Sequence, residues 1–441
     1  MTYKEFFKEK KIAVIGLGPH GEMIADIKFL LKHAGEVTLY DLRSHARMKG
    51  YLPKLKEAGL EKHAFGEIPK DDLAGFDLIV LSPEISKKSH FLKAPIRAGI
   101  QVEFPETLFF KLAPIVTLIG VMGVCGKTTV SQLIYSILKK SFAEHPDQGF
   151  FFIDPESSNG ALTHLKKIKK GDVLLARIPE YMMEHYYAMR ISPHVAVVTG
   201  LSSLDPRDVK RSLSILEFQT YNNFIVASDV VMDAVKAEPD FASKAKILRT
   251  RKSSVPKDWT SGIRATHALE NAALALQTSE LFKVPTDIAR DIIATFLGLK
   301  GRIEFVKKVA NVDYYNDTAS ITPHATLSAL RTLATHKNIV LIFGGAYTGH
   351  DYGTFLRSVA EFVTTIVLLP GSGTLGLRDD LMLLPEVRVV QVPHLEDAVK
   401  KARDSVRKGD IVLFSPGFEA VGFDISRKER GERFVKAVRA L

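Results

Sequence analysis

The sequence has very little cysteine, since Cys125 is the only one among its 441 residues. One cysteine excludes an internal disulfide framework and a zinc cluster built on cysteine ligands. Long apolar stretches are also missing. None reaches the roughly 18 residues that a membrane span requires, and the charged segment 1–11 lacks the apolar core of a secretory signal. These absences predict a cytoplasmic protein with no membrane partner.

Basic residues outnumber acidic ones, but not in the pattern of a nucleic-acid-binding protein. The formal net charge is +10, yet lysines and arginines are scattered in short clusters such as 166–170, with no stripe of interleaved aromatic residues. We interpret the excess as solvated helix faces, which also suit a protein with anionic nucleotide substrates. We predict no nucleic-acid partner and a monomeric chain.

The length and the apolar pattern predict several α/β domains. With 46% apolar and 25% charged residues, the chain is typical of globular proteins and long enough for two to four domains. Three blocks alternate strand-like and helix-like patterns, which favours mainly parallel sheets covered by helices. The expected strands are 12–15, 37–40 and 78–81 in the first block, 115–119, 150–153, 173–176, 195–198 and 224–227 in the second, and 339–343, 366–369 and 411–414 in the third. An amphipathic helix is expected over 267–282 and a hinge over 298–301.

Segment 120–129, which reads Gly-Val-Met-Gly-Val-Cys-Gly-Lys-Thr-Thr, lies between a predicted strand and a predicted helix. That order provides open backbone N–H groups, a helix N-terminus and one lysine, which a triphosphate site needs. Lys127 would neutralise the β- and γ-phosphate oxygens of ATP, and the Thr128 hydroxyl would bind Mg²⁺. The spacing is a variant, because Val121 stands where the strict motif has glycine; an ordinary turn is the alternative.

A second glycine fingerprint, Gly16-Leu-Gly18-Pro-His-Gly21, falls between a strand and a helix of the first block, and Asp41 closes the next strand. Such glycines admit a diphosphate to a helix N-terminus, and the acidic residue accepts hydrogen bonds from a sugar or base. A nicotinamide cofactor is the default interpretation, which would make the chain an oxidoreductase. However, a diphosphate site and an ATP site on one chain fit a ligase with a nucleotide-carried substrate better.

Taken together, the motifs resemble those of the Mur ligases, the ATP-dependent amide-forming enzymes of peptidoglycan precursor synthesis. The resemblance spans essentially the whole chain and is closest to the branch that adds D-glutamate to UDP-N-acetylmuramoyl-L-alanine. Its elements occur in order: Gly16-Leu-Gly18, Asp41-Leu-Arg43, Ser82-Pro83-Glu84-Ile85, the phosphate loop, Thr266-His267 through Asn271, Phe296 through Glu304, Tyr315-Asn316-Asp317, Phe343-Gly344-Gly345, Ser415-Pro416 and Arg430-Gly431.

The resemblance implies three α/β domains: a Rossmann-like UDP-binding domain (1–110), a central P-loop ATPase domain with a mainly parallel sheet (111–299), and a mobile Rossmann-like C-terminal domain (300–441). ATP and Mg²⁺ are the implied cofactors, and D-glutamate is joined through an acyl phosphate. The implied contacts are Gly16, Gly18 and Gly21 to the UDP diphosphate, Asp41 and Arg43 to the uracil end, Gly123, Gly126, Lys127, Thr128 and Thr129 to the ATP phosphates, Asn271 to adenine, Arg302 and Asp317 to ATP, and Ser415 to the amino acid.

Simpler interpretations of three of these residues stay open. Arg302 can be a surface ion-pair residue, Asn271 a polar residue on a helix face, and Asp41 a turn residue.

The chain departs from the family pattern where catalysis is expected. Arg177 stands in place of a metal-binding glutamate, unless Glu180 or Glu184 shifts into that role, and we hypothesise that it replaces part of the metal charge. Other changes are the absence of an Asn and an Asp-His pair in 199–205, of the carbamylated lysine near 210–218, of one lysine each at Ala319 and Thr348, and of polar residues at Val124 and Cys125. The alternative to a divergent ligase is therefore a weakly active or non-catalytic nucleotide-binding relative with a regulatory or scaffolding role.

Overall fold

The computed structural model describes residues 2–18, 21–68, 72–123, 126–144, 147–157, 159–200, 213–236, 243–259, 266–296, 298–347, 351–420 and 427–441. The chain forms two compact units, one made of Met1–Trp259 with Leu269–Ile293 and the other of Thr260–Ala268 with Ala294–Leu441. The first unit holds two sheets and the second unit holds one, and helices cover all three. This confirms the predicted α/β class with mainly parallel sheets. The exact domain bounds 1–110, 111–299 and 300–441 stay a prediction.

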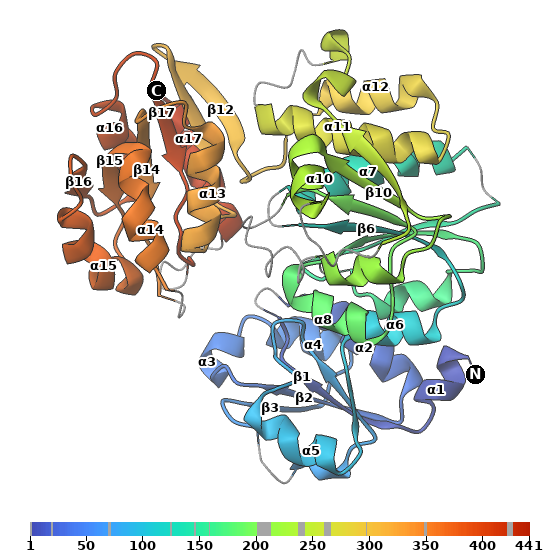
Figure 1. The fold of residues 1–441 in the computed structure, drawn as a ribbon. Coiled ribbons are helices and arrows are strands. Elements are labelled where there is room, and N and C mark those ends of the chain that lie inside the picture. The colour runs from blue at the N-terminus through green and yellow to red at the C-terminus, as the bar shows by residue number, and fades with distance from the viewer. Residues whose placement is uncertain are drawn as a thin grey trace. The chain divides into compact units, whose positions relative to one another are not determined.

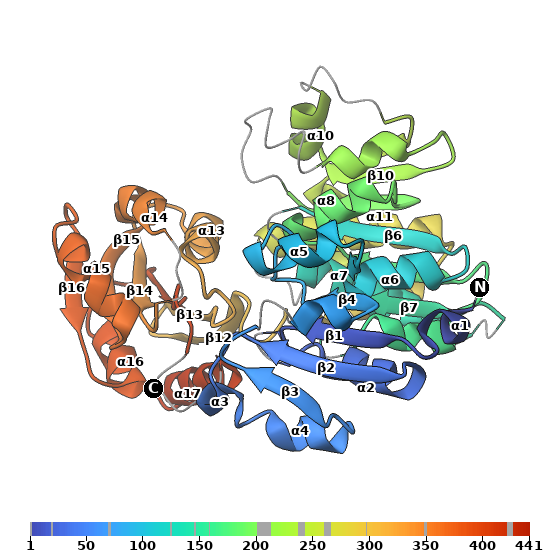
Figure 2. The same cartoon turned by 90° about the horizontal axis from the view of Figure 1, so that it is seen from below.

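The first sheet has the strand order β3-β2-β1-β4-β5, and every neighbouring pair is parallel. Figures 1 and 2 show α2 and α4 on one face and α5 on the other. Because both faces are covered, the strands are apolar runs rather than alternating patterns. The strands are β1 (Lys11–Ile15), β2 (Glu36–Asp41), β3 (Lys62–Phe65), β4 (Leu78–Leu81) and β5 (Gln101–Glu103); the helices are α1 (Tyr3–Phe7), α2 (Ile24–His33), α3 (His45–Met48), α4 (Leu52–Glu57), α5 (Lys93–Arg97) and α6 (Pro105–Leu112).

The second sheet has the order β11-β10-β9-β6-β8-β7 and is also parallel throughout. Helix α7 packs on β6 and β8. The strands are β6 (Thr117–Met122), β7 (Phe150–Ile153), β8 (Val173–Arg177), β9 (Val195–Val198), β10 (Phe224–Ser228) and β11 (Lys246–Thr250); the helices are α7 (Lys127–Phe142), α8 (Glu180–Ala188), α10 (Asp229–Lys236), α11 (Thr266–Leu281) and α12 (Thr286–Thr295).

The predicted strand 115–119 is shifted relative to β6. The strand begins at Thr117 and continues to Met122, so Gly120, which we expected to open the phosphate loop, is a strand residue. A Cβ at Gly120 would lie 2.4 Å from the Pro193 ring and 2.9 Å from the Ile178 side chain. Gly120 therefore serves close packing, and the turn itself starts later.

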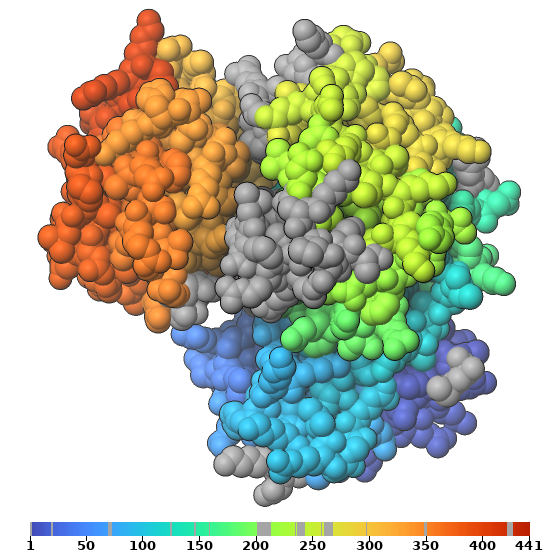
Figure 3. All heavy atoms as spheres, viewed as in Figure 1, coloured from blue at the N-terminus to red at the C-terminus, as the bar shows by residue number. Residues whose placement is uncertain are grey.

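The third sheet has the order β12-β13-β17-β14-β15-β16, with only the β12–β13 pair antiparallel among its described strands. The central strands, visible as ribbons in Figure 1, are covered by side chains in the space-filling view of Figure 3. The strands are β12 (Glu304–Val309), β13 (Val312–Asn316), β14 (Ile339–Phe343), β15 (Val363–Leu368), β16 (Arg388–Gln391) and β17 (Ile411–Phe414); the helices are α13 (Pro323–Leu333), α14 (Gly353–Ser358), α15 (Ser372–Met382), α16 (Leu395–Arg403) and α17 (Arg427–Arg439).

Strand β14 shows why the third sheet needs helices on both faces. Ile339, Leu341 and Phe343 pack into a core with α13 and α14, whereas Val340 and Ile342 pack into a second core with α16 and α17. All five side chains are fully buried. Successive residues of a strand point to opposite faces, so an uninterrupted apolar run fills both cores.

None of the helices in the described part of the chain is long and apolar enough to cross a membrane.

Candidate functional site

The turn between β6 and α7 has the backbone that a phosphate loop requires. Gly123 and Gly126 have φ angles of +118° and +81°. A Cβ at Gly123 would lie 2.6 Å from a carbonyl oxygen just past β9, and one at Gly126 would lie 2.6 Å from Asn271 Oδ1. Residues that have a Cβ atom rarely adopt such positive φ angles, and a Cβ would also clash with these neighbours. Glycine is therefore strongly favoured at both positions. Val124 and Cys125 lie outside the described residues.

The first turn of α7 carries the predicted phosphate-binding side chains. Lys127 begins the helix, and its Nζ donates a hydrogen bond to the carbonyl oxygen of Gly123 at 2.5 Å. Thr128 and Thr129 follow and are half-buried. The first N–H groups of a helix have no partner within it, so this end of a 16-residue helix carries partial positive charge. The loop, the lysine and the helix N-terminus therefore fit a phosphate anion.

Asn271 lies on α11 and is brought to the phosphate loop, where it packs against Gly126. Its side chain is only 7% exposed, so it is not a solvated residue on a helix face. A contact between Asn271 and adenine remains a prediction.

The other glycine fingerprint forms a left-handed loop after β1. Gly16, Gly18 and Gly21 all have φ of +83°. A Cβ at Gly16 would lie 2.9 Å from Ser82 Cβ and 2.7 Å from the Ile85 side chain, which follow β4. The loop thus lies at the carboxyl edge of the sheet, where β1 and its neighbour β4 both end, which is where open α/β sheets bind ligands.

Asp41 and Arg43 form a rigid pair at the end of β2. Arg43 donates from Nε to Asp41 Oδ1 at 2.9 Å and from Nη2 to Asp41 Oδ2 at 2.7 Å. Burial alone would raise the pKa of Asp41, but the hydrogen bonds from Arg43 and from the Leu17 backbone hold it below its ordinary value. The Arg43 guanidinium also lies 5.7 Å from the ring centroid of Tyr51. Asp41 is therefore more than a turn residue, because it fixes Arg43.

Asp317 and Ser415 meet at the ends of β13 and β17 in the C-terminal unit. Ser415 donates from Oγ to Asp317 Oδ2 at 2.8 Å, and the Ile303 backbone N–H donates to Asp317 Oδ1 at 3.1 Å. Burial raises the pKa of Asp317 to about 6, although these hydrogen bonds oppose the shift. Ser415 has no exposed surface, so its hydroxyl is engaged with Asp317 instead of facing a pocket. Its predicted contact to the amino acid stays untested.

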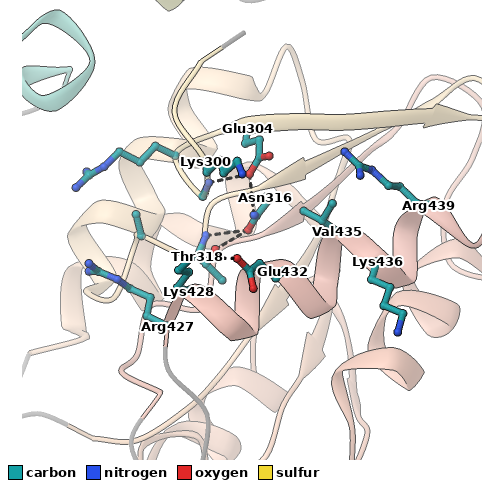
Figure 4. Close-up of a pocket in the computed structure, with 14 residues that line it drawn as sticks. Lys300, Glu304, Asn316, Thr318, Arg427, Lys428, Glu432, Val435, Lys436 and Arg439 are labelled. Atoms are coloured by element: carbon teal, nitrogen blue, oxygen red, sulfur yellow. Dashed lines mark hydrogen bonds and ion pairs between the residues drawn. The ribbon is translucent and has the colours of Figure 1, made fainter. Parts of the chain in front are cut away.

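Arg302 lines a cavity of about 610 Å³ in the C-terminal unit. Figure 4 shows Lys300, Asn316 and Thr318 on one wall and Arg427 and Lys428 on α17 opposite. Six cationic and two acidic side chains line this cavity, so it suits an anion. The cationic residues are Lys300, Arg302, Arg427, Lys428, Lys436 and Arg439, and the acidic ones are Glu304 and Glu432. Ala319, where the family pattern has lysine, also lines it.

Arg177 does not present an uncompensated charge. It is the last residue of β8 and only 3% exposed. Its Nε donates to Asp154 Oδ1 at 2.6 Å, and its Nη2 lies 2.8 Å from Glu156 Oε1. Because two carboxylates already balance the guanidinium, the geometry gives no support to our hypothesis that Arg177 replaces metal charge.

Among the described residues, no group of three or more His, Cys, Asp and Glu side chains is arranged to hold a metal ion. Glu184, offered above as a substitute ligand, pairs instead with Lys88 at 3.3 Å. Residues 201–212 and Thr348 lie outside the described part of the chain; they include most of the segment where the family carries its metal-binding histidine and the start of the segment where the carbamylated lysine is expected. Residues 213–218 of the latter segment are described and contain no lysine. Thr128 therefore stays the one residue that we predict to bind Mg²⁺.

Sequence reasoning missed some side chains that surround the predicted ones and gave no role to Glu84 within its motif. Asp154 and Glu156 follow β7 and Tyr51 precedes α4, and none of the three belongs to a motif with a recognisable spacing. The sequence did give one usable signal: Asp154 directly follows a predicted strand and Glu84 lies three residues after another, and parallel strands end at one edge of a sheet.

Family models match both ends of the chain. The model described as "Mur ligase MurD-like, N-terminal domain" matches residues 10–103, and "Mur ligase, glutamate ligase domain" matches residues 301–418. The UDP-N-acetylmuramoylalanine–D-glutamate ligase of Roseiflexus sp. (strain RS-1) is 30% identical over 97% of this chain and 98% of its own length. The chain belongs to the Mur ligase family. A ligase of the same name from Bdellovibrio bacteriovorus is 28% identical over 99% of both chains.

Solved structures show the same fold at lower identity. The UDP-N-acetylmuramate–alanine ligase MurC of Thermotoga maritima matches with a TM-score of 0.57 at 16% identity, over 98% of this chain and 100% of that one. The MurF ligase of Thermotoga maritima, solved in complex with ADP, matches with a TM-score of 0.53 at 16% identity, over 100% and 97%.

Gly126→Ala tests whether the turn before α7 is built for a phosphate. The alanine would adopt a left-handed backbone at a cost of about 1–2 kcal/mol and would also push Asn271 away. We expect adenine-nucleotide affinity, measured by calorimetry, to fall at least about tenfold. Gly59→Ala is the matched control, because Gly59 has φ of +89° but open space around its Cβ position. Unchanged nucleotide affinity in Gly126→Ala would contradict the assignment.

Two carboxylic acids, Glu106 and Asp26, are buried in the first unit. Burial raises the pKa of Glu106 to about 8, with Asp26 and Asp154 adding to the shift, and burial raises the pKa of Asp26 to about 7. Asp26 Oδ1 accepts a hydrogen bond from the Leu162 N–H at 2.8 Å. At pH values between the ordinary and the raised pKa of these two acids, the native state binds more protons than the unfolded state. Stability should therefore be greatest at low pH in this window and decrease as the pH rises to 8.

Glu106→Gln should flatten this pH dependence, because glutamine cannot release a proton. Between pH 5 and 8 the wild type should lose stability with a slope of up to about 1.4 kcal/mol per pH unit from Glu106 alone. Urea unfolding at several pH values measures that slope. The exposed Glu57→Gln serves as control and should keep the wild-type slope. Parallel curves for Glu106→Gln and wild type would show that Glu106 is ionised in the native state.

Proposed function

We propose that the chain joins D-glutamate to UDP-N-acetylmuramoyl-L-alanine in an ATP-dependent reaction of peptidoglycan precursor synthesis. The observation that carries this proposal is full-length similarity to D-glutamate ligases in a chain that keeps the glycine turn and Lys127 at the start of α7. Fold likeness to other Mur ligases alone would not select D-glutamate as the amino acid.

The proposed chemistry has two steps. A carboxylate oxygen of the alanyl residue attacks the γ-phosphorus of ATP, ADP leaves, and an acyl phosphate forms. The amine of D-glutamate then attacks the acyl carbon, phosphate leaves with the C–O electron pair, and the nitrogen loses a proton to give the amide. The first step converts a poor acyl donor into one with a good leaving group, and its transition state needs positive charge around the phosphoryl oxygens.

Lys127 and the N-terminal N–H groups of α7 would supply that charge. Lys127 Nζ now bonds to the carbonyl oxygen of Gly123, a weaker acceptor than a phosphate oxygen, so an incoming nucleotide can take over the ammonium group. Thr128 would hold Mg²⁺, which supplies charge neutralisation at the phosphates when bound. Arg302 lines a cationic cavity and is our second proposed nucleotide contact.

Asp317 would act by holding neighbouring residues in place and not by contacting the nucleotide itself. Its carboxylate is tied to Ser415 and to the backbone of Ile303, the residue next to Arg302. We therefore propose that Asp317 holds the Arg302 segment in place and that Ser415 holds Asp317.

Phosphate release from ATP tests the function directly. We expect release that depends strictly on both UDP-N-acetylmuramoyl-L-alanine and D-glutamate, with the amide product identified by mass spectrometry. Lys127→Ala should lower turnover at least about a hundredfold, because it removes a charge that contacts the transferring group. Lys139→Ala, at the exposed far end of the same helix, is the matched control.

The same assay tests the non-catalytic alternative. One observation favours that alternative: Arg177, paired with Asp154 and Glu156, occupies the place of an expected metal-binding acid. Tight ATP binding without substrate-dependent phosphate release would support a regulatory or scaffolding relative and contradict the ligase.

A further inference from the structure

The carboxylate of Asp41 is already saturated with hydrogen bonds. Oδ1 accepts from the backbone N–H and the Nε of Arg43, both at 2.9 Å. Oδ2 accepts from the Leu17 N–H at 2.9 Å and from Arg43 Nη2 at 2.7 Å. A carboxylate oxygen has two lone-pair sites, so these four donors occupy the full capacity of the group. Asp41, the acidic residue that the glycine fingerprint assigns to the nucleoside, therefore has its hydrogen-bonding capacity used by protein groups.

Another acidic side chain reaches the glycine loop from the neighbouring strand. Glu84 follows β4, and its Oε2 accepts a hydrogen bond from Ser82 Oγ at 2.5 Å. Its Oε1 lies 3.6 Å from the point where a Cβ at Gly16 would be. Glu84 is exposed, whereas Ser82 is fully buried, so the serine anchors the carboxylate at the edge of the loop. One oxygen is thus oriented by the protein while the other faces the loop.

A flat surface lies beside the same loop. The Tyr51 ring lies 3.0 Å from the point where a Cβ at Gly21 would be, and the Arg43 guanidinium lies 5.7 Å from the ring centroid. Because Asp41 holds the guanidinium with two hydrogen bonds, its plane is fixed. Guanidinium and aromatic planes of this kind stack on heterocycles, so this corner suits a nucleobase.

The charge of Glu84 decides what it can contact. A carboxylate at the loop repels a diphosphate and, when ionised, offers only acceptor sites. Uridine has the matching donors, namely the N3–H of the base and the hydroxyls of the ribose. Resting on the proposed UDP-linked substrate, we propose that Glu84, in place of Asp41, accepts a hydrogen bond from the uridine, with the base against Arg43 and Tyr51 and the diphosphate directed away from Glu84.

The effect of removing Glu84 on uridine-nucleotide affinity has opposite signs under the two interpretations. If Glu84 accepts a donor from uridine, Glu84→Met should weaken UMP and UDP binding by about tenfold, as the loss of a hydrogen bond to a charged group predicts. Glu84→Gln keeps an acceptor oxygen and should lose less. If Glu84 is merely an acid near the phosphates, Glu84→Met should bind UDP more tightly. Calorimetry on the full chain measures both without requiring ligase turnover.

Modified ligands identify the donor. N3-methyl-UMP should bind wild type and Glu84→Met equally if the donor is the base N–H, and 2′-deoxy-UMP should do so if it is the ribose hydroxyl. Glu61→Met is the control, because Glu61 is exposed and precedes β3, at the opposite edge of the sheet. If the wild type binds UDP and Glu84→Met binds it equally well or more tightly, the role of Glu84 is overturned and the proposed substrate is not. A wild type that binds no uridine nucleotide overturns it together with the proposed substrate.

Discussion

The strand-to-helix turn that joins β6 to α7 is the constraint on which the candidate site depends. Gly123 and Gly126 adopt left-handed backbone angles that are unfavourable for other residues, and a side chain at either position would collide with residues just past β9 or with Asn271. That packing fixes the direction of α7, and with it the N–H groups and Lys127. A phosphate site of this kind consists mostly of oriented backbone, so it tolerates substitution of the intervening residues better than displacement of either glycine.

Much of the fold was predictable, because both faces of each sheet are buried. The predicted strands 150–153, 195–198 and 411–414 coincide with β7, β9 and β17. A strand covered by helices on both faces is a short continuous apolar run, which is easy to recognise in the sequence. The boundary of β6 was not predictable from glycine content. Gly120 reads as a loop residue in the sequence, and only the ring of Pro193 against it explains why a strand carries glycine there. The low strand propensity of glycine was therefore misleading here, because packing against Pro193 determines the conformation at Gly120.

The sequence predicted which residues lie in the site, but it did not predict their hydrogen-bond partners. The sequence pointed to Asp41, Asp317 and Ser415, but it could not show that Arg43 consumes the lone pairs of Asp41 or that Ser415 bonds to Asp317 across 98 residues. Ser415 and Asp317 follow β17 and β13, which are adjacent in the sheet but distant in the chain, whereas Arg43 is only two residues from Asp41 and its bonding depends on how its side chain folds back. Acidic residues at strand ends are therefore weak evidence for ligand contact until the donors around them are counted.

The replaced cations and acids form a consistent electrostatic pattern within each unit. In the first unit Arg177 stands where an acid is expected, yet Asp154 and Glu156 restore the negative charge beside it, while the carboxylate of Asp26 helps burial to raise the pKa of Glu106. In the C-terminal unit Ala319, which stands where the family pattern has lysine, lines a cavity that Arg427 and Lys428 also line. Charge lost at one position thus reappears on a neighbouring element. The excess of cationic over acidic side chains around the C-terminal cavity produces the positive potential that an anion site requires, even without a lysine at position 319.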